Sequence, residues 1–167
     1  MQIRTEQPAD RQAVFALHTE AFPTDAEARL VDLLRDSAAD FVSLVALHHE
    51  QIVGHILFTP VSADGDADSG IAGLAPMAVL PERQRVGIGK QLVESGLKDC
   101  ADAGYGAVVV LGHPEYYPRF GFVPASQFGL ACEYDVPDEV FMALELRPDF
   151  LAGINGEVRY DKAFASL

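Results

Sequence analysis

The chain has 167 residues, of which 49% are hydrophobic and 22% are charged, and its formal net charge is −13. This composition excludes a disordered or fibrous chain, and the length suits one ordinary domain spanning residues 1–167. The acidic balance repels polyanions, so a general nucleic-acid binder is disfavoured and no nucleic-acid partner is expected.

Targeting and metal-binding signals are missing from the sequence pattern. No apolar run approaches the roughly 18 residues that a bilayer span needs, and the start Met1-Gln2-Ile3-Arg4 has no apolar signal core. We therefore expect a cytoplasmic protein without a membrane partner. Cys100 and Cys132 have no CxxC or Cys/His spacing around them, so neither a disulfide framework nor a zinc site is indicated.

Hydrophobic spacing predicts two helices and a hairpin in the first third of the chain. Pro8 suits a first helical turn, and Asp25 is a suitable N-cap for a second helix with apolar residues at three- and four-residue spacing. Two runs rich in β-branched residues follow, joined by a short polar connector. We expect a strand at 2–4, helices at 8–21 and 26–37, and antiparallel strands at 41–47 and 52–59.

The acidic segment from Ser62 to Gly70 admits two interpretations. Asp64, Asp66 and Asp68 together with two glycines suggest a calcium loop. The glutamate that closes such a loop at its twelfth position is missing, so a solvated hairpin tip is the favoured prediction.

The middle of the chain predicts a strand, helix, strand unit. Ile71–Val79 has strand length, but Pro76 cannot donate to a ladder and therefore indicates an edge or a bulge. A helix is expected from Ile88 to about Ala103, and Ala107–Leu111 is a fully apolar strand candidate. The two strands of such a unit lie parallel, and a further strand is expected at 140–146, so the fold class is α/β with a mixed sheet.

The turn before the third helix has the features of an anion site. Amides at a helix start have no intrahelical partner, and glycines at 87 and 89 remove side chains that would hold a phosphate away. A tight turn into a structural helix is the alternative. The segment lacks the Gly-Lys-Ser/Thr ending of a nucleoside-triphosphate loop, which speaks against nucleotide hydrolysis. Its three cations are Arg83, Arg85 and Lys90.

Two motifs in order resemble the GCN5-related N-acetyltransferase (GNAT) superfamily. The first is Gln84-x-x-Gly87-x-Gly89 after an apolar strand, and the second is Tyr117-x-x-x-Gly121-Phe122. The ending Gly156-x-Val158-x-Tyr160-x-x-Ala163-Phe164 is similar to one group of bacterial predicted N-acetyltransferases. The resemblance implies a mixed, mostly antiparallel central sheet with one splayed parallel strand pair, flanked by helices.

The resemblance also implies acetyl-CoA as acyl donor, with no metal. The donor would lie in a V-shaped opening between the strands that end near Val79 and Leu111. The backbone of Met77 and Val79 would pair with the pantetheine amides, and the amides of 84–90 would hold the pyrophosphate. Arg85 stands at a position that is often glycine in the superfamily. The expected cofactor-binding residues are Met77, Ala78, Val79, Gln84, Arg85, Val86, Gly87, Ile88, Gly89 and Lys90.

The implied reaction is direct attack by a primary amine of a small molecule or peptide on the thioester. Tyr117 matches the family's general acid, and Tyr116 is its rival. A backbone N–H near Ala78 or Val79 would bind the oxyanion. For the base, Glu27 is the expected residue.

Several alternatives remain open at this point. An ordered water, His55 or His113 could replace Glu27 as the base, and a homodimer is compatible with the resemblance. The alternative function is a catalytically silent acyl-CoA sensor or a protein-interaction module.

Overall fold

A computed structural model describes residues 1–166, so Leu167, the last residue of the predicted domain range, lies outside the described residues. None of the described helices combines the length and the apolar content that a bilayer crossing requires. The helices are α1 (Arg11–Ala21), α2 (Ala26–Ser37) and α3 (Ile88–Asp102). The strands are β1 (Gln2–Thr5), β2 (Val42–His48), β3 (Gln51–Ala63), β4 (Asp66–Val79), β5 (Ala107–Leu111), β6 (Val123–Pro124), β7 (Leu130–Cys132), β8 (Phe141–Glu145) and β9 (Gly156–Arg159).

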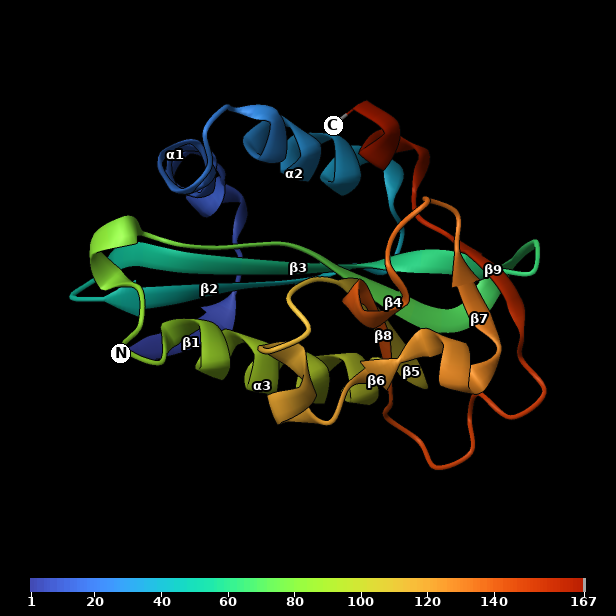
Figure 1. The fold of residues 1–167 in the computed structure, drawn as a ribbon. Coiled ribbons are helices and arrows are strands. Elements are labelled where there is room, and N and C mark those ends of the chain that lie inside the picture. Colours follow the sequence, from blue (N-terminus) through green and yellow to red (C-terminus); the bar gives the residue numbers. More distant parts are fainter. Residues whose placement is uncertain (167) are drawn as a thin grey trace.

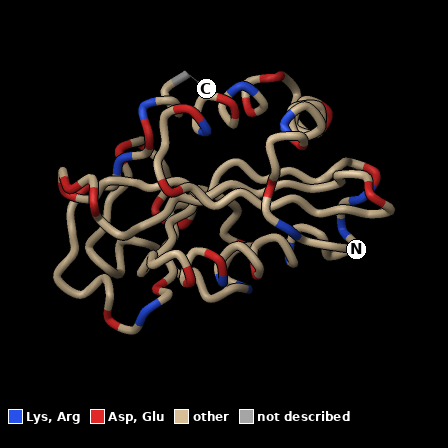
Figure 2. Tube along the Cα trace, turned by 180° about the vertical axis from the view of Figure 1, so that it is seen from behind, with Lys and Arg blue, Asp and Glu red and all other residues tan. Residues whose placement is uncertain are grey.

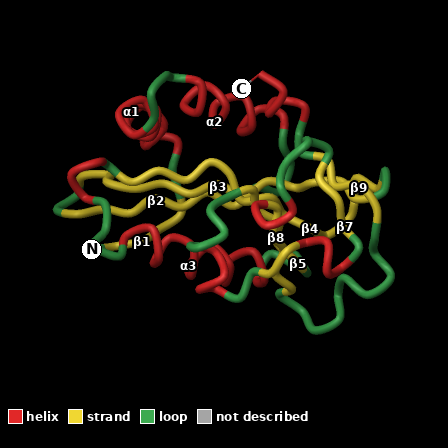
Figure 3. Tube along the Cα trace, in the orientation of Figure 1, coloured by secondary structure: helices red, strands yellow, loops and turns green. Residues whose placement is uncertain are grey.

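The strands form one mixed sheet between two helical layers (Figures 1 and 3). Its main path runs β1-β2-β3-β4-β5-β8-β6, in which β4 and β5 are parallel and the other neighbours are antiparallel. β9 extends from β3 and forms a second, short parallel pair with β7. α1 and α2 cover one face, and α3 covers the other (Figure 1). The predicted mixed α/β class is confirmed.

The period-2 alternation of β3 separates the two faces of the sheet. A Cβ on Gly54 would lie 2.9 Å from Leu92 of α3, and the ring of Phe58 fills the place of a Cβ on Gly96 of α3 at 2.2 Å. Gly54 and Phe58 therefore face α3. Alternate residues of a strand point to opposite faces, so His55 and Thr59 face the α1/α2 layer.

Several predicted boundaries were wrong. The β3–β4 hairpin is longer than expected, and its tip is only Asp64-Gly65 rather than the whole segment from Ser62 to Gly70. Asp66 still pairs with Ala63 and extends the ladder. The strands β6, β7 and β9 were not predicted, and α1 is preceded by a separate 3₁₀ turn at Pro8–Asp10.

The parallel pair separates in the middle of the sheet. β4 and β5 pair from Ile71 with Ala107 to Leu74 with Val110, and no pairing is found beyond that point in the described chain. On the other side, Ile56 and Phe58 of β3 pair with Met77 and Leu74, so β4 carries one extra residue around Ala75 and Pro76. The expected bulge at Pro76 is therefore present. Beyond it, β4 and β5 leave a gap.

Candidate active site

A cavity of about 680 Å³ lies where β4 and β5 separate. It is bounded by the end of β4, the loop into α3, the 113–119 segment after β5, and the end of α1. Eight of the ten residues expected to bind a cofactor line it: Met77, Ala78, Val79, Gln84, Arg85, Gly87, Gly89 and Lys90. Of the other two, Val86 is exposed to solvent, and Ile88 is buried in the core under α3.

The start of α3 presents unpaired amides to this cavity. No backbone acceptor is found for the amides of residues 85–90 in the described chain. Gly87 is the N-cap with φ of +92°, and a Cβ at this position would meet nothing within 4 Å. Unpaired amides and the positive end of the helix dipole favour an anion here, and the open space at Gly87 leaves room for one. The geometry fits a diphosphate group.

The loop before α3 is fixed to β4 and carries positive charge. Nε2 of Gln84 donates to the carbonyl oxygen of Val79 at 3.1 Å, which ties the loop to the strand end. Arg85 has φ of +67°, in the left-handed region that favours glycine. Arg83, Arg85 and Lys90 all line the cavity, as does Arg119, which the sequence did not single out.

Tyr117 reaches the same cavity from the 3₁₀ turn Tyr117–Phe120. Its side chain is buried, and its ring packs on Gly112, where a Cβ would lie 2.2 Å from Cε2. Burial, then the neighbouring Tyr116, raises the pKa of Tyr117 to about 12. The hydroxyl therefore keeps its proton at neutral pH. Tyr116 also lines the cavity, with Arg119 stacked 5.7 Å from its ring centroid.

The candidate bases differ in whether they line the cavity. His113 lines the cavity. Glu27 does not, but its position is unusual, because its Oε1 is buried without a hydrogen-bond partner. Glu27 is three, four and seven residues before Leu30, Val31 and Leu34, which are buried, so it belongs to the face of α2 that covers the sheet. Among the described residues, no group of three or more His, Cys, Asp or Glu could hold a metal ion.

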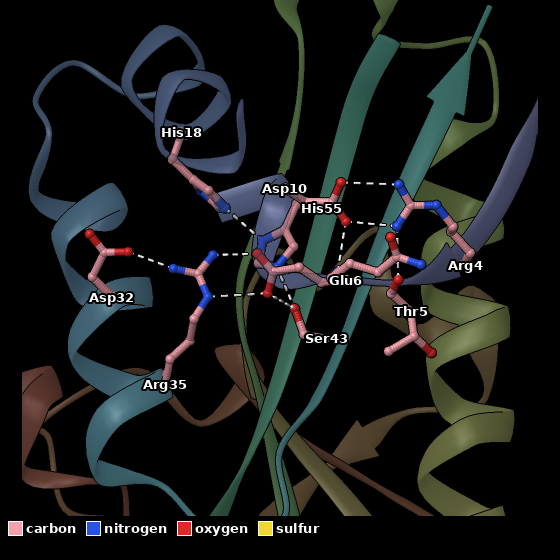
Figure 4. Close-up of polar contacts among 10 residues, drawn as sticks. Arg4, Thr5, Glu6, Asp10, His18, Asp32, Arg35, Ser43 and His55 are labelled. Carbon is pink, nitrogen blue, oxygen red and sulfur yellow. Dashed lines mark hydrogen bonds and ion pairs between the residues drawn. The ribbon is translucent and has the colours of Figure 1, made fainter. Parts of the chain in front are cut away.

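His55 lies in a buried polar network and does not line the cavity (Figure 4). Its Nδ1 lies 2.8 Å from Nε2 of His18, and its Nε2 lies 2.8 Å from Oγ of Ser43. Both ring nitrogens are thus engaged, so His55 is not free to serve as a base. The Ser43 hydroxyl donates to Glu6, which is paired with Arg35 of α2. His18 stacks on Phe22, which does line the cavity.

Comparison with known proteins gives a consistent result. A model of the Acetyltransferase (GNAT) family matches residues 11–122. YhbS of Escherichia coli (strain K12), named an uncharacterized N-acetyltransferase, is 39% identical over 165 residues, which cover 98% of both chains. The crystal structure of Escherichia coli YhbS with CoA has a TM-score of 0.93 at 38% identity, over 98% of this chain and 91% of that one. The crystal structure of a GNAT family acetyltransferase from Brucella melitensis with acetyl-CoA has a TM-score of 0.81 at 36% identity. This match covers 98% of this chain and 97% of that one.

Proposed function

Because this chain belongs to the GNAT family of acetyltransferases, we propose that it transfers an acetyl group from acetyl-CoA to a primary amine by direct attack, with Tyr117 as general acid. One observation carries the proposal. A single cavity joins the unpaired amides at the start of α3 to Tyr117 across the gap between β4 and β5. An acyl thioester and the acid that its thiolate needs would therefore meet in one place.

The cavity supports binding of the donor along its length. The amides of 85–90 and the side chains of Arg85 and Lys90 suit the pyrophosphate. Among the described residues, the edge of β4 at 77–79 has no strand partner on the β5 side, so it can pair with the pantetheine amides as a missing strand would. The thioester would then lie near the bulge at Ala75 and Pro76.

The chemistry requires one bond to form and one to break. The amine nitrogen bonds to the acetyl carbon, the carbon–sulfur bond breaks, and the thiolate takes a proton from the Tyr117 hydroxyl. The products are the acetylated amine and free CoA. A backbone N–H at Ala78 or Val79 would stabilise the developing oxyanion. Burial of Tyr117 supports its role because the hydroxyl stays protonated at neutral pH.

The proton that the amine loses has a candidate acceptor in Glu27. Its unpartnered Oε1 faces the sheet under α2, where a buried carboxylate oxygen without a donor is costly. An amine entering from the α1/α2 side would supply that donor. The acceptor class proposed is a small-molecule or peptide amine.

Donor binding is tested first by thermal unfolding with and without acetyl-CoA. At a hundredfold excess over its dissociation constant, a ligand that binds only the folded state adds about 2.7 kcal/mol. Release of free CoA on adding a pool of primary amines tests transfer. No thermal shift would reject the proposal, whereas a shift without CoA release would favour the alternative of an acyl-CoA sensor.

A further inference from the structure

A second cavity, of about 310 Å³, lies at the same separation of strands. Ala75 and Leu111 line it, and each directly follows the residue at which the pairing of β4 with β5 ends, Leu74 or Val110. Its remaining lining residues are Tyr134, Tyr160 and Phe164. We call it the aromatic cavity.

The aromatic cavity lies on the side of the sheet opposite α3. Thr59 faces the α1/α2 layer, and its cross-strand partner is Gly73. The ring of Tyr160 packs on Gly73, where a Cβ would lie 2.7 Å from Cε1. Cross-strand partners share a face, so Tyr160 covers the α1/α2 side. The first cavity extends to this side as well, because Ala21 of α1 lines it. A donor held at the start of α3 would therefore bring its thioester end toward the aromatic cavity.

The walls of the aromatic cavity suit a flat apolar group. The rings of Tyr134 and Tyr160 stack with centroids 6.3 Å apart, and those of Tyr160 and Phe164 lie 5.2 Å apart. Of the residues that the structure describes, those that line it are all uncharged. Tyr134 is exposed, so the cavity has a route to solvent. Aromatic walls without a charge favour an aromatic ligand over a polycation.

One polar group in this wall lacks a partner. The Tyr160 side chain is only 8% exposed, and its hydroxyl is buried without a hydrogen bond. The Thr59 hydroxyl, opposite Gly73 on the same face, is also buried and unpaired. A buried hydroxyl without a partner is costly, so we expect a ligand or water atom to form a hydrogen bond with it. A hydrocarbon acyl tail has no such atom, whereas an acceptor with an oxygen has one.

We propose that the aromatic cavity holds the acceptor, and that this acceptor is a compact arylalkylamine bearing a hydroxyl or carbonyl oxygen. The proposal rests on the acetyl transfer proposed above. The amine would point to Ala75 and Leu111, the ring would lie among Tyr134, Tyr160 and Phe164, and the oxygen would meet Tyr160. An apolar cavity disfavours an ammonium ion, so burial itself would help to present the neutral amine that attacks the thioester.

The experiment compares four amines with acetyl-CoA: 2-phenylethylamine, tyramine, 2-amino-1-phenylethanol and spermidine. We expect the aromatic amines to exceed spermidine at least about tenfold in kcat/KM, the scale of discrimination by an apolar pocket. Tyr160→Phe keeps the ring and removes the hydroxyl. It should raise KM about tenfold for an oxygen-bearing amine, with little change for 2-phenylethylamine or in KM for acetyl-CoA.

Tyr105→Phe is the matched control, because the Tyr105 hydroxyl donates to the carbonyl oxygen of Asp40 at 2.8 Å and the residue lines neither cavity. This substitution should leave kcat/KM unchanged for all four amines. Saturation-transfer NMR of 2-phenylethylamine on the CoA complex gives a readout independent of turnover, and we expect transfer to the aromatic protons.

Three outcomes would overturn the proposal. Preference for spermidine would do so, as would the lack of an NMR signal on a complex that binds CoA. Faster transfer from hexanoyl-CoA than from acetyl-CoA, lost in Tyr134→Ala, would assign the cavity to the acyl chain. In all three cases acetyl-CoA binding is retained, and release of CoA with any other primary amine would still support the proposed function. Failure of the chain to bind acetyl-CoA would remove both proposals.

Discussion

The position of Tyr117 depends on a residue with no side chain. Gly112 directly follows β5, and the Tyr117 ring occupies the space that a Cβ there would need. The ring also packs edge-on against Tyr116 and Phe122, with centroids 5.1 and 5.7 Å away. These contacts hold the buried ring in place beside the cavity. The position of Tyr117, the proposed acid, is thus set by packing as well as by its place in the motif.

Replacing Tyr117 by Phe tests its role with little change in packing. We expect kcat for acetyl transfer to fall by about ten- to a thousandfold, because the thiolate then leaves without a proton donor. The dissociation constant of CoA should stay the same. Tyr105→Phe is the control, since burial likewise raises the pKa of Tyr105 to about 12 but this residue lies outside the cavity. Unchanged kcat in Tyr117→Phe would exclude it as the acid.

The sequence pointed to Gly87, Gly89 and Tyr117 because their motifs are short and contiguous. All three line the main cavity, and their roles in binding and catalysis stay predictions. Phe22 and Arg119 line the same cavity but were not predicted, because only the packing of α1 and of the turn after β5 brings them there. Arg85 was noted as a substitution at a glycine-favouring position, and its positive φ gives the physical reason for that preference.

For helices and strands, the wrongly predicted boundaries of the β3–β4 hairpin come from its turn. Asp64 and Gly65 both have positive φ, 50° and 80°, as a two-residue hairpin turn requires, and Asp-Gly is a strong signal for such a turn. The acidic residues around it suggested a longer solvated loop. β6, β7 and β9 have only two to four residues and lie in the turn-rich last third of the chain. They were missed because their pairing with distant strands, and not a pattern of their own, defines them.

Gly87 and Gly65 both have a positive φ, so replacing each of them by Ala distinguishes an effect on stability from an effect on CoA binding. Gly87→Ala at the start of α3 and Gly65→Ala at the hairpin tip both place a Cβ in open space at positive φ. Each should cost about 1 kcal/mol of unfolding free energy in chemical denaturation. Only Gly87→Ala should raise the dissociation constant of CoA, by about tenfold, because it turns amides away from the diphosphate. Equal affinities in the two variants would contradict the role of the α3 amides.

Two features extend over the whole molecule: its acidic surface charge, and the buried polar network around His55. Acidic positions outnumber basic ones 25 to 12 and are spread over both helical layers and the loops (Figure 2). Four cations nevertheless line the main cavity, as the positive segment before α3 led us to expect in part.

The network of Glu6, His18, Arg35, Ser43 and His55 joins α1 and α2 to the sheet.

This network predicts a stability that depends on pH. Burial, then His55 and Arg35, lowers the pKa of His18 to about 3, and burial, then Arg35, lowers that of His55 to about 3. The unfolded chain binds these protons below about pH 6.5 and the folded chain does not. The unfolding free energy should therefore fall between pH 6.5 and 3, by about 1.4 kcal/mol per unit for each histidine.

Chemical denaturation at several pH values between 7 and 4 measures this slope. His18→Gln can still donate to His55 but does not titrate, so the slope should become smaller. His49→Asn, in the exposed turn between β2 and β3, should keep the original slope. A slope that is the same in all three proteins would assign the acid sensitivity to other groups.

The separation of β4 from β5 also bears on how a ligand can come and go. The two strands share four residue pairs, from Ile71 to Leu74, and near that end β9 bridges β3 and β7. Their backbone pairing thus lies wholly on one side of the cavity. A coenzyme that enters or leaves between the unpaired ends therefore needs no hydrogen bond between these two strands to break.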